Sequence, residues 1–153
     1  MRIGSISEDR RIEKRIAVTP DIIKKYISLG FEVCLSENYG THLGIKDEQY
    51  LEMGAKISKD EMEILNSSDI IVQLALLSDD KSSGIKENQI LIGVLNPYNY
   101  KEKLDSLVRK KINLFSLELL PRITRAQSMD ILSSQANLAG YKAVIESFAN
   151  FEK

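Results

Sequence analysis

The chain is poor in the residues that usually carry metal or nucleophile chemistry. Among its 153 residues it has one cysteine, one histidine and no tryptophan. Cys34 has no partner for an internal disulfide, and its place in the strand-like run Phe31–Leu35 favours a buried, unreactive thiol. His42 lies in a glycine-flanked loop without clustered ligands or a nucleophile, which argues against a zinc site and against a Ser-His-Asp set. No metal site is therefore expected.

Long apolar runs and an excess of one charge are absent as well. No run approaches the roughly 20 apolar residues that cross a bilayer, and no signal-peptide pattern opens the chain. The net charge of −1 gives no reason to expect nucleic acid as a partner. The apolar share of 43% and the charged share of 28% are ordinary for a globular protein. We expect a single domain over residues 1–153, cytoplasmic or peripheral on the cytoplasmic face of a membrane complex.

Short apolar runs alternate with helical patterns along most of the chain. The predicted strands are Arg2–Ile6, Phe31–Leu35, Asp69–Leu77, Gln89–Leu95 and Ile112–Leu119. The predicted helices run from Thr19–Pro20 to Gly30, over Asp47–Met53, from a Ser58-Lys-Asp-Glu61 capping box to Leu65, and over Tyr100–Lys111. This alternation predicts an α/β fold, a doubly wound, flavodoxin-like parallel sheet with helices on both faces.

The end of the chain predicts one long helix over about 124–151. Thr124 and Gln127 have the Thr-x-x-Gln spacing of a capping box. Polar residues then recur at steps of three and four, in one stripe with Ser133 at its edge: Gln127, Asp130, Ser134, Asn137 and Tyr141. A core helix does not need an ordered row of amides, a carboxylate and hydroxyls, whereas a helix that lines a polar cleft does.

The length and small residues of this predicted helix suggest that another element packs on it. At about 1.5 Å per residue it would extend roughly 40 Å, more than the roughly 30 Å diameter of a compact domain of this size. Small side chains would permit a close approach by another element: Ala136, Ala139, Gly140 and Ala143. We therefore expect the helix to project or to lie along a domain boundary.

Two motifs resemble one enzyme family. The run Arg122–Tyr141, which reads Arg-Ile-Thr-Arg-Ala-Gln-Ser-Met-Asp-Ile-Leu-Ser-Ser at its start, resembles the NAD-binding part of the alpha subunit of proton-translocating NAD(P) transhydrogenase. The openings Met1–Gly4 and Glu13–Pro20 resemble the start that transhydrogenases share with alanine dehydrogenases. The resemblance implies that the last helix leads into a Rossmann NAD-binding domain, whose Gly-x-Gly-x-x-Gly motif does not occur in this chain.

The resemblance also implies the site residues. Arg122, Gln127 and Asp130 would act in catalysis by contacting bound NAD(H), and Ser133 would add a hydroxyl near the nicotinamide amide. The remaining cofactor contacts would come from Ile123, Thr124, Ser128 and Met129. Without the resemblance, these residues have simpler interpretations: Arg122 would pair with a helix start or with Glu118, Gln127 would serve only the cap, Asp130 would be a solvated carboxylate, and Ser133 would bond back within the helix.

The implied chemistry is hydride transfer, which belongs to the cofactors, while the protein supplies orientation and excludes water. NADP(H) would bind on a partner domain, membrane parts would couple the reaction to proton translocation, and the intact enzyme would be a homodimer. We expect this chain alone to be inactive and to bind NAD(H) weakly or not at all.

Two alternatives remain open from the sequence. An alanine dehydrogenase-like fragment would use Arg15 for a substrate carboxylate, although a structural ion pair of Arg15 is equally compatible. Ala75 and Asn96 stand where alanine dehydrogenases carry a Lys and a His, which argues against that function, and Gln73 replaces a Lys common in both families. The second alternative is a non-enzymatic assembly domain that uses its last helix for association.

Overall fold

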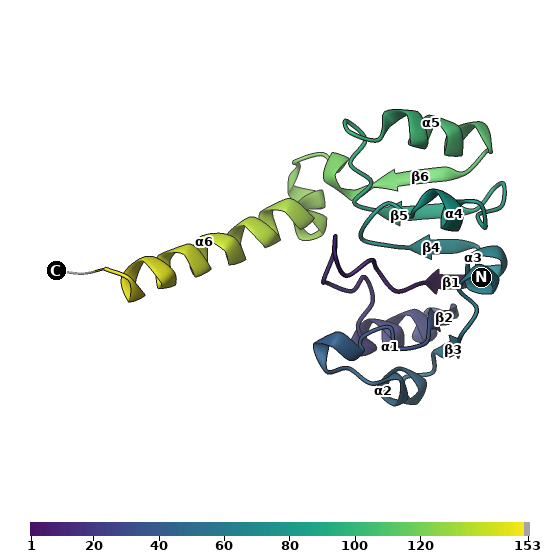
Figure 1. Ribbon diagram of the computed structural model, residues 1–153, viewed down its shortest axis with the longest axis horizontal. Coiled ribbons are helices and arrows are strands. Elements are labelled where there is room, and N and C mark those ends of the chain that lie inside the picture. The colour runs from purple at the N-terminus through teal and green to yellow at the C-terminus, as the bar shows by residue number, and fades with distance from the viewer. Residues whose placement is uncertain (152–153) are drawn as a thin grey trace. The chain divides into compact units, whose positions relative to one another are not determined.

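The computed structural model describes residues 1–151, which form two compact units: Met1–Ser116 and a C-terminal unit that begins at Leu117. The N-terminal unit holds a six-stranded sheet in which every neighbouring pair is parallel. Its strands are β1 Arg2–Ser5, β2 Glu32–Ser36, β3 Lys56–Ser58, β4 Ile70–Val72, β5 Ile90–Gly93 and β6 Asn113–Ser116 (Figure 1). The predicted α/β class with a parallel sheet is confirmed.

The strand order shows why the fold class was predicted correctly although one strand was missed. The order is β3-β2-β1-β4-β5-β6. Without β3, the five predicted strands take the 2-1-3-4-5 order of flavodoxin-like sheets; with β3, the order is the 3-2-1-4-5-6 of dinucleotide-binding folds. The sequence analysis missed β3, which pairs Lys56 with Cys34 and Ile57 with Leu35 at the sheet edge. The order reverses between β1 and β4, where such sheets bind ligands.

Local signals place most helices of this unit. These are α1 Pro20–Ser28, α2 Asp47–Glu52, α3 Glu61–Ser67, α4 Asp79–Ser82 and α5 Lys101–Arg109, with a 3-10 turn at Thr41–Leu43. Thr19 and Pro20 open α1 as predicted, and Gly30 follows its end with φ of 84°, which only glycine adopts at low cost.

Several predicted boundaries were wrong. The cap of α3 is Asp60, whose carboxylate accepts from the Glu63 N–H at 3.0 Å, because Ser58 is still part of β3. The predicted strand Asp69–Leu77 ends at Val72, and Ile112–Leu119 ends at Ser116, where a 3-10 turn begins. The short helix α4, Asp79–Ser82, was not among the predicted helices.

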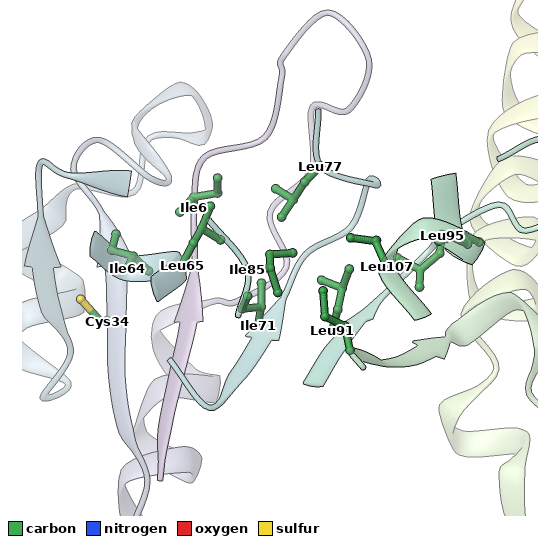
Figure 2. Packing of buried hydrophobic residues seen from close by; sticks show 12 residues of the cluster. Ile6, Cys34, Ile64, Leu65, Ile71, Leu77, Ile85, Leu91, Leu95 and Leu107 are labelled. Carbon is green, nitrogen blue, oxygen red and sulfur yellow. The ribbon is translucent and has the colours of Figure 1, made fainter. Parts of the chain in front are cut away.

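Two apolar clusters cover opposite faces of the sheet. Val33 and Leu35 belong to one and Cys34 to the other, as expected for successive side chains of a strand. Helices α1 and α2 contribute to the first cluster, whereas α3 and α5 contribute to the second, which Figure 2 shows from Cys34 to Leu95. The predictions of helices on both faces and of a buried Cys34 are confirmed, and burial raises the pKa of this thiol.

The C-terminal unit differs from the single helix predicted over 124–151. It has 3-10 helices at Leu117–Leu119 and Thr124–Met129, followed by α6, Ile131–Ala149. Asp130 has φ of −74° and ψ of 95°, so the helical path is broken there and restarts at Ile131. None of the helices in residues 1–151 is both long and apolar enough to span a membrane.

Candidate functional site

Asp130 caps α6. One carboxylate oxygen accepts from the N–H of Leu132 at 3.0 Å and from that of Ser133 at 3.1 Å, and the other accepts from the Ser133 hydroxyl at 2.6 Å. The predicted capping box at Thr124 and Gln127 was wrong: the 3-10 helix there has no side-chain cap bond. A charged carboxylate interacts more favourably than a hydroxyl with the positive end of a nineteen-residue helix. This is a physical reason why Asp130, and not Thr124, is the cap.

The cap stabilises the ionised form of Asp130. The hydrogen bond from the Ser133 hydroxyl lowers the pKa of Asp130 most, the backbone N–H donors add to this, and the charge of Arg122 lowers it further. The Asp130 carboxylate is partly exposed and at the same time caps α6. The simpler interpretation of Ser133 was wrong, because its hydroxyl donates to Asp130 rather than to the helix backbone. This segment of the chain thus holds a fixed negative charge.

The other predicted residues lie on both sides of this break. Arg122 precedes the 3-10 helix Thr124–Met129, which carries Gln127. Arg122 and every residue of this 3-10 helix except the buried Ala126 are exposed. Since the helix is interrupted at Asp130, the predicted continuous stripe does not form, and only Ser134, Asn137 and Tyr141 of its members share α6. Arg122 to Ser133 remain a short polar segment whose charged groups are Arg122, Arg125 and Asp130.

The N-terminal unit contains a pocket of about 590 Å³ that the sequence analysis did not predict. It lies where β1 and β4 end, at the reversal of strand order, and α4 and α5 contribute to its wall. It is lined by Ser7, Glu8, Asp9, Arg11, Ile12, Gln73, Ala75, Leu76, Leu77, Ser78, Asp80, Lys81, Tyr100 and Lys103. The rule that ligands bind at the carboxyl ends of strands next to a reversal could have located it.

Two side chains join the loops at this pocket. Glu8 reaches from the loop after β1 and accepts from the N–H of Leu74 at 2.6 Å and from that of Ala75 at 3.2 Å. Burial raises the pKa of Glu8, and the two backbone donors oppose this. The buried Gln73 donates to the Ile6 carbonyl oxygen at 2.8 Å and accepts from the Ile6 N–H at 3.2 Å. Gln73 is therefore a structural bridge between the ends of β1 and β4.

The charges around the pocket are largely paired. Arg11 pairs with Asp9 at 2.7 Å, Lys103 pairs with Asp79 at 2.7 Å, and Lys81 pairs with Glu61 at 2.8 Å. The pairing with Arg11 lowers the pKa of Asp9 to about 2. Such a pocket offers polar contacts but no free cation among these three for an anionic substrate.

The residues expected of an alanine dehydrogenase are not arranged for that chemistry. The Arg15 guanidinium makes two bonds to the Glu13 carboxylate, at 2.9 and 2.7 Å, and this pairing lowers the pKa of Glu13. Ala75 lines the pocket with a methyl group in place of an amine. The structural ion pair, which the sequence left open for Arg15, is therefore what forms.

His42, the only histidine in the sequence, holds two loops together. His42 Nε2 lies 2.7 Å from the Lys14 carbonyl oxygen and ties the loop before α1 to the 3-10 turn Thr41–Leu43. Across residues 1–151, no group of three or more His, Cys, Asp and Glu side chains could hold a metal ion.

A protein-family model described as alanine dehydrogenase/PNT, N-terminal domain, matches residues 4–139. The chain belongs to this family. An NAD(P) transhydrogenase alpha-subunit protein of Rickettsia prowazekii is 38% identical over 100% of this chain and 41% of its own length. The crystal structure of transhydrogenase from Sinorhizobium meliloti superposes with a TM-score of 0.91 at 34% identity, over 100% of this chain and 46% of that one.

Alanine dehydrogenases are more distant relatives of this family member. That of Methanococcus maripaludis is 26% identical over 94% of this chain and 38% of its own length. The resemblance to the transhydrogenase alpha subunit is therefore confirmed, and the chain is a member of an oxidoreductase family. It spans 41% of the length of the transhydrogenase relatives from Rickettsia prowazekii and Rhodospirillum rubrum and 29% of that from Haemophilus influenzae.

Proposed function

We propose that this chain is the N-terminal, NAD(H)-cleft-forming part of an NAD(P) transhydrogenase. The match to transhydrogenase alpha subunits over the whole chain carries the proposal, because alanine dehydrogenases match at lower identity. The intact enzyme would transfer hydride from NADH to NADP+, coupled to proton translocation. Within it, α6 would lead into a Rossmann domain that binds NAD(H).

The polar groups of the segment 122–133 fit a nicotinamide carboxamide. That group presents one oxygen that accepts and one amide nitrogen that donates hydrogen bonds. Arg122 can donate to the oxygen, the ionised Asp130 can accept from the amide, and Gln127 can do either. The Ser133 hydroxyl holds the Asp130 carboxylate at 2.6 Å and so fixes the direction of its free lone pairs.

The protein's role in the reaction would be orientation. Bound NAD(H) supplies the hydride chemistry. Arg122, Gln127 and Asp130 would set which face of the nicotinamide ring meets the second nucleotide, and Ile123, Thr124, Ser128 and Met129 would line the ring and ribose. The exposure of Met129 and Ile123, at 54% and 55%, leaves their apolar surfaces available for such contacts. Because the chain would supply only one wall, we expect it to be inactive alone.

The partners follow from the same proposal. They are the Rossmann NAD-binding domain, an NADP(H)-binding domain and membrane parts, in a homodimeric enzyme on the cytoplasmic face of a membrane. The isolated chain would bind NAD(H) only weakly, so that binding is detected at millimolar and not at micromolar concentration. The ion pair of Arg15 with Glu13 does not favour an alanine dehydrogenase. The Asp130 carboxylate, whose pKa is lowered, does not favour a purely structural domain.

Binding of NADH to site variants tests this proposal. NADH fluorescence would be titrated at millimolar protein for the natural chain, for Arg122→Gln, and for Arg109→Gln, a matched change in the last turn of α5. We expect Arg122→Gln to weaken binding at least about tenfold, as for a lost charge-assisted contact of 1.4 kcal/mol, and Arg109→Gln to leave it unchanged. Equal affinities, or hydride transfer to an NADP+ analogue by the chain alone, would contradict the proposal.

A further inference from the structure

The pocket at the ends of β1 and β4 has no part in the proposed hydride transfer. Its volume of about 590 Å³ is within the roughly 300–1,000 Å³ that is typical of small-molecule sites. It is placed at the reversal of strand order, where sheets of this topology bind ligands. The charged and apolar side chains of its wall indicate the kind of ligand that it takes.

Glu8 brings a negative charge to this wall without a matching cation. Within the described part of the chain no ion pair involves Glu8, whose carboxylate oxygens accept from the N–H groups of Leu74 and Ala75. Arg15 attracts Glu8 only through its charge, since its guanidinium is bonded to Glu13. Because an ionised carboxylate can accept about four hydrogen bonds, Glu8 keeps capacity for a donor from a ligand.

The cations of the wall are already paired. Arg11, Lys81 and Lys103 each form an ion pair with a carboxylate. Asp80, a further carboxylate of the wall, accepts from the Ser78 hydroxyl and forms no ion pair within the described chain. The wall and its ion-pair partners contain five carboxylates and three cations, so their net charge is −2. This excess repels an anionic ligand and attracts a cation.

The rest of the wall suits an alkyl group. Its apolar side chains are Ile12, Ala75, Leu76 and Leu77. The Tyr100 side chain also lines the pocket and is 50% exposed, so its ring can receive a cation on its face. An organic cation carries its charge on an apolar body and can therefore contact the carboxylates, the ring and the apolar side chains together. A bare metal ion would make none of the apolar contacts.

We propose that this pocket binds a small organic cation, an alkylammonium or alkylguanidinium ion. Glu8 and Asp80 attract its charged group, the ring of Tyr100 contacts it, and the apolar wall takes the alkyl part. An amino acid fits less well, because all three cations of the wall are paired and its carboxylate would lack a partner. None of the lining residues belongs to the segment 122–133, so the proposal does not depend on NAD(H) binding.

NMR titrations of the isotope-labelled chain with butylammonium, butanol and butyrate test the charge preference. The amides of Leu74 and Ala75 report on the site, because both donate to Glu8. We expect butylammonium to saturate their shifts at roughly 1–10 mM and to bind at least about tenfold more tightly than butanol, as for one charge-assisted hydrogen bond. Butyrate should cause no saturable shift. Equal affinities for butylammonium and butanol, or the same shifts with sodium chloride alone, would overturn the proposal.

Three variants test the anionic contacts. Glu8→Gln should abolish the preference for butylammonium over butanol, but it also disturbs the bonds of Glu8 to the backbone. Asp80→Asn leaves those bonds in place at an exposed position, and it should weaken butylammonium binding about two- to fivefold, as for an exposed ion pair. Asp105→Asn is the matched control, since Asp105 lies on α5 and does not line the pocket. Equal affinities of the two asparagine variants would contradict the assigned site.

Two further comparisons test the ring and the ligand class. Tyr100→Leu should weaken binding of butylammonium about two- to fivefold and leave that of butanol unchanged, as for a lost cation–π contact. Norvaline, which is butylammonium with a carboxylate added, should bind at least about tenfold more weakly, because its second charge finds no partner. Norvaline binding as tightly as butylammonium would overturn the proposal and indicate an amino-acid site.

Discussion

Replacing Gln73 with methionine removes the amide that joins the ends of β1 and β4 while nearly keeping the side-chain volume. Gln73 is 1% exposed and bonds to both backbone groups of Ile6. Because Ile6 is 0% exposed, water cannot replace these bonds without local opening. The substitution therefore leaves one N–H and one C=O buried without partners.

The expected cost follows from these two groups. Each buried polar group without a partner costs about 1–3 kcal/mol, and burying the methionine returns about 1 kcal/mol of transfer free energy. We expect a net loss of about 1–5 kcal/mol from the free energy of unfolding, which is of the order of 5–15 kcal/mol for a typical domain. With a urea m value of about 2 kcal/mol/M, the midpoint should fall by roughly 0.5–2.5 M.

Urea unfolding followed by near-ultraviolet circular dichroism measures this loss, because Tyr39 and Tyr50 are buried in the same unit and the chain lacks tryptophan. Gln135→Met is the matched control, since it makes the same chemical change on the exposed surface of α6. A loss below about 0.5 kcal/mol, the range of ordinary surface substitutions, would refute the reasoning that this amide bridges the two strands.

Three further predictions concern the same elements. Gly93→Ala should cost about 2–3 kcal/mol because its Cβ would lie 2.1 Å from the Gln73 carbonyl oxygen, and an unchanged urea midpoint would contradict this. Burial raises the pKa of Glu8 in the folded protein above its ordinary value of 4.5. The protonated carboxyl therefore contributes to stability below pH 4.5, and this contribution is lost as the pH rises through the pKa of the folded protein. A titration midpoint of the Glu8 carboxyl at or below 4.5 by NMR would contradict this prediction. Asp130→Ala should speed hydrogen exchange of the Leu132 and Ser133 amides but not that of the last turn of α6, and equal rates would show that Asp130 is not the cap.

The sheet could be predicted because its central strands are buried on both faces and read as continuous apolar runs. Gly30 and Pro20 fixed the ends of α1 through backbone conformations that do not depend on the rest of the fold. Strand β3 could not be found in this way, since it has three residues and forms only because β2 offers an edge. Its assignment depends on tertiary pairing rather than on local pattern.

Part of the candidate site could likewise be predicted from the sequence, and part could not. The polar character of Arg122–Ser133 is visible in the sequence, but the helix break at Asp130 is not, because it depends on the backbone conformation of that residue. The pocket beside β1 and β4 depends on Glu8 bonding to Leu74 and Ala75, which lie 66 and 67 positions away. Hydrogen bonds over such separations leave no periodic signal.

An NMR titration of the chain with NADH and, separately, with pyruvate tests the central claim most directly. The account predicts amide shifts confined to 122–133 with NADH, even at millimolar affinity, and none with pyruvate. Shifts with pyruvate near Arg15 and Ala75, with none at Arg122 or Asp130 with NADH, would contradict it and indicate an amino-acid dehydrogenase.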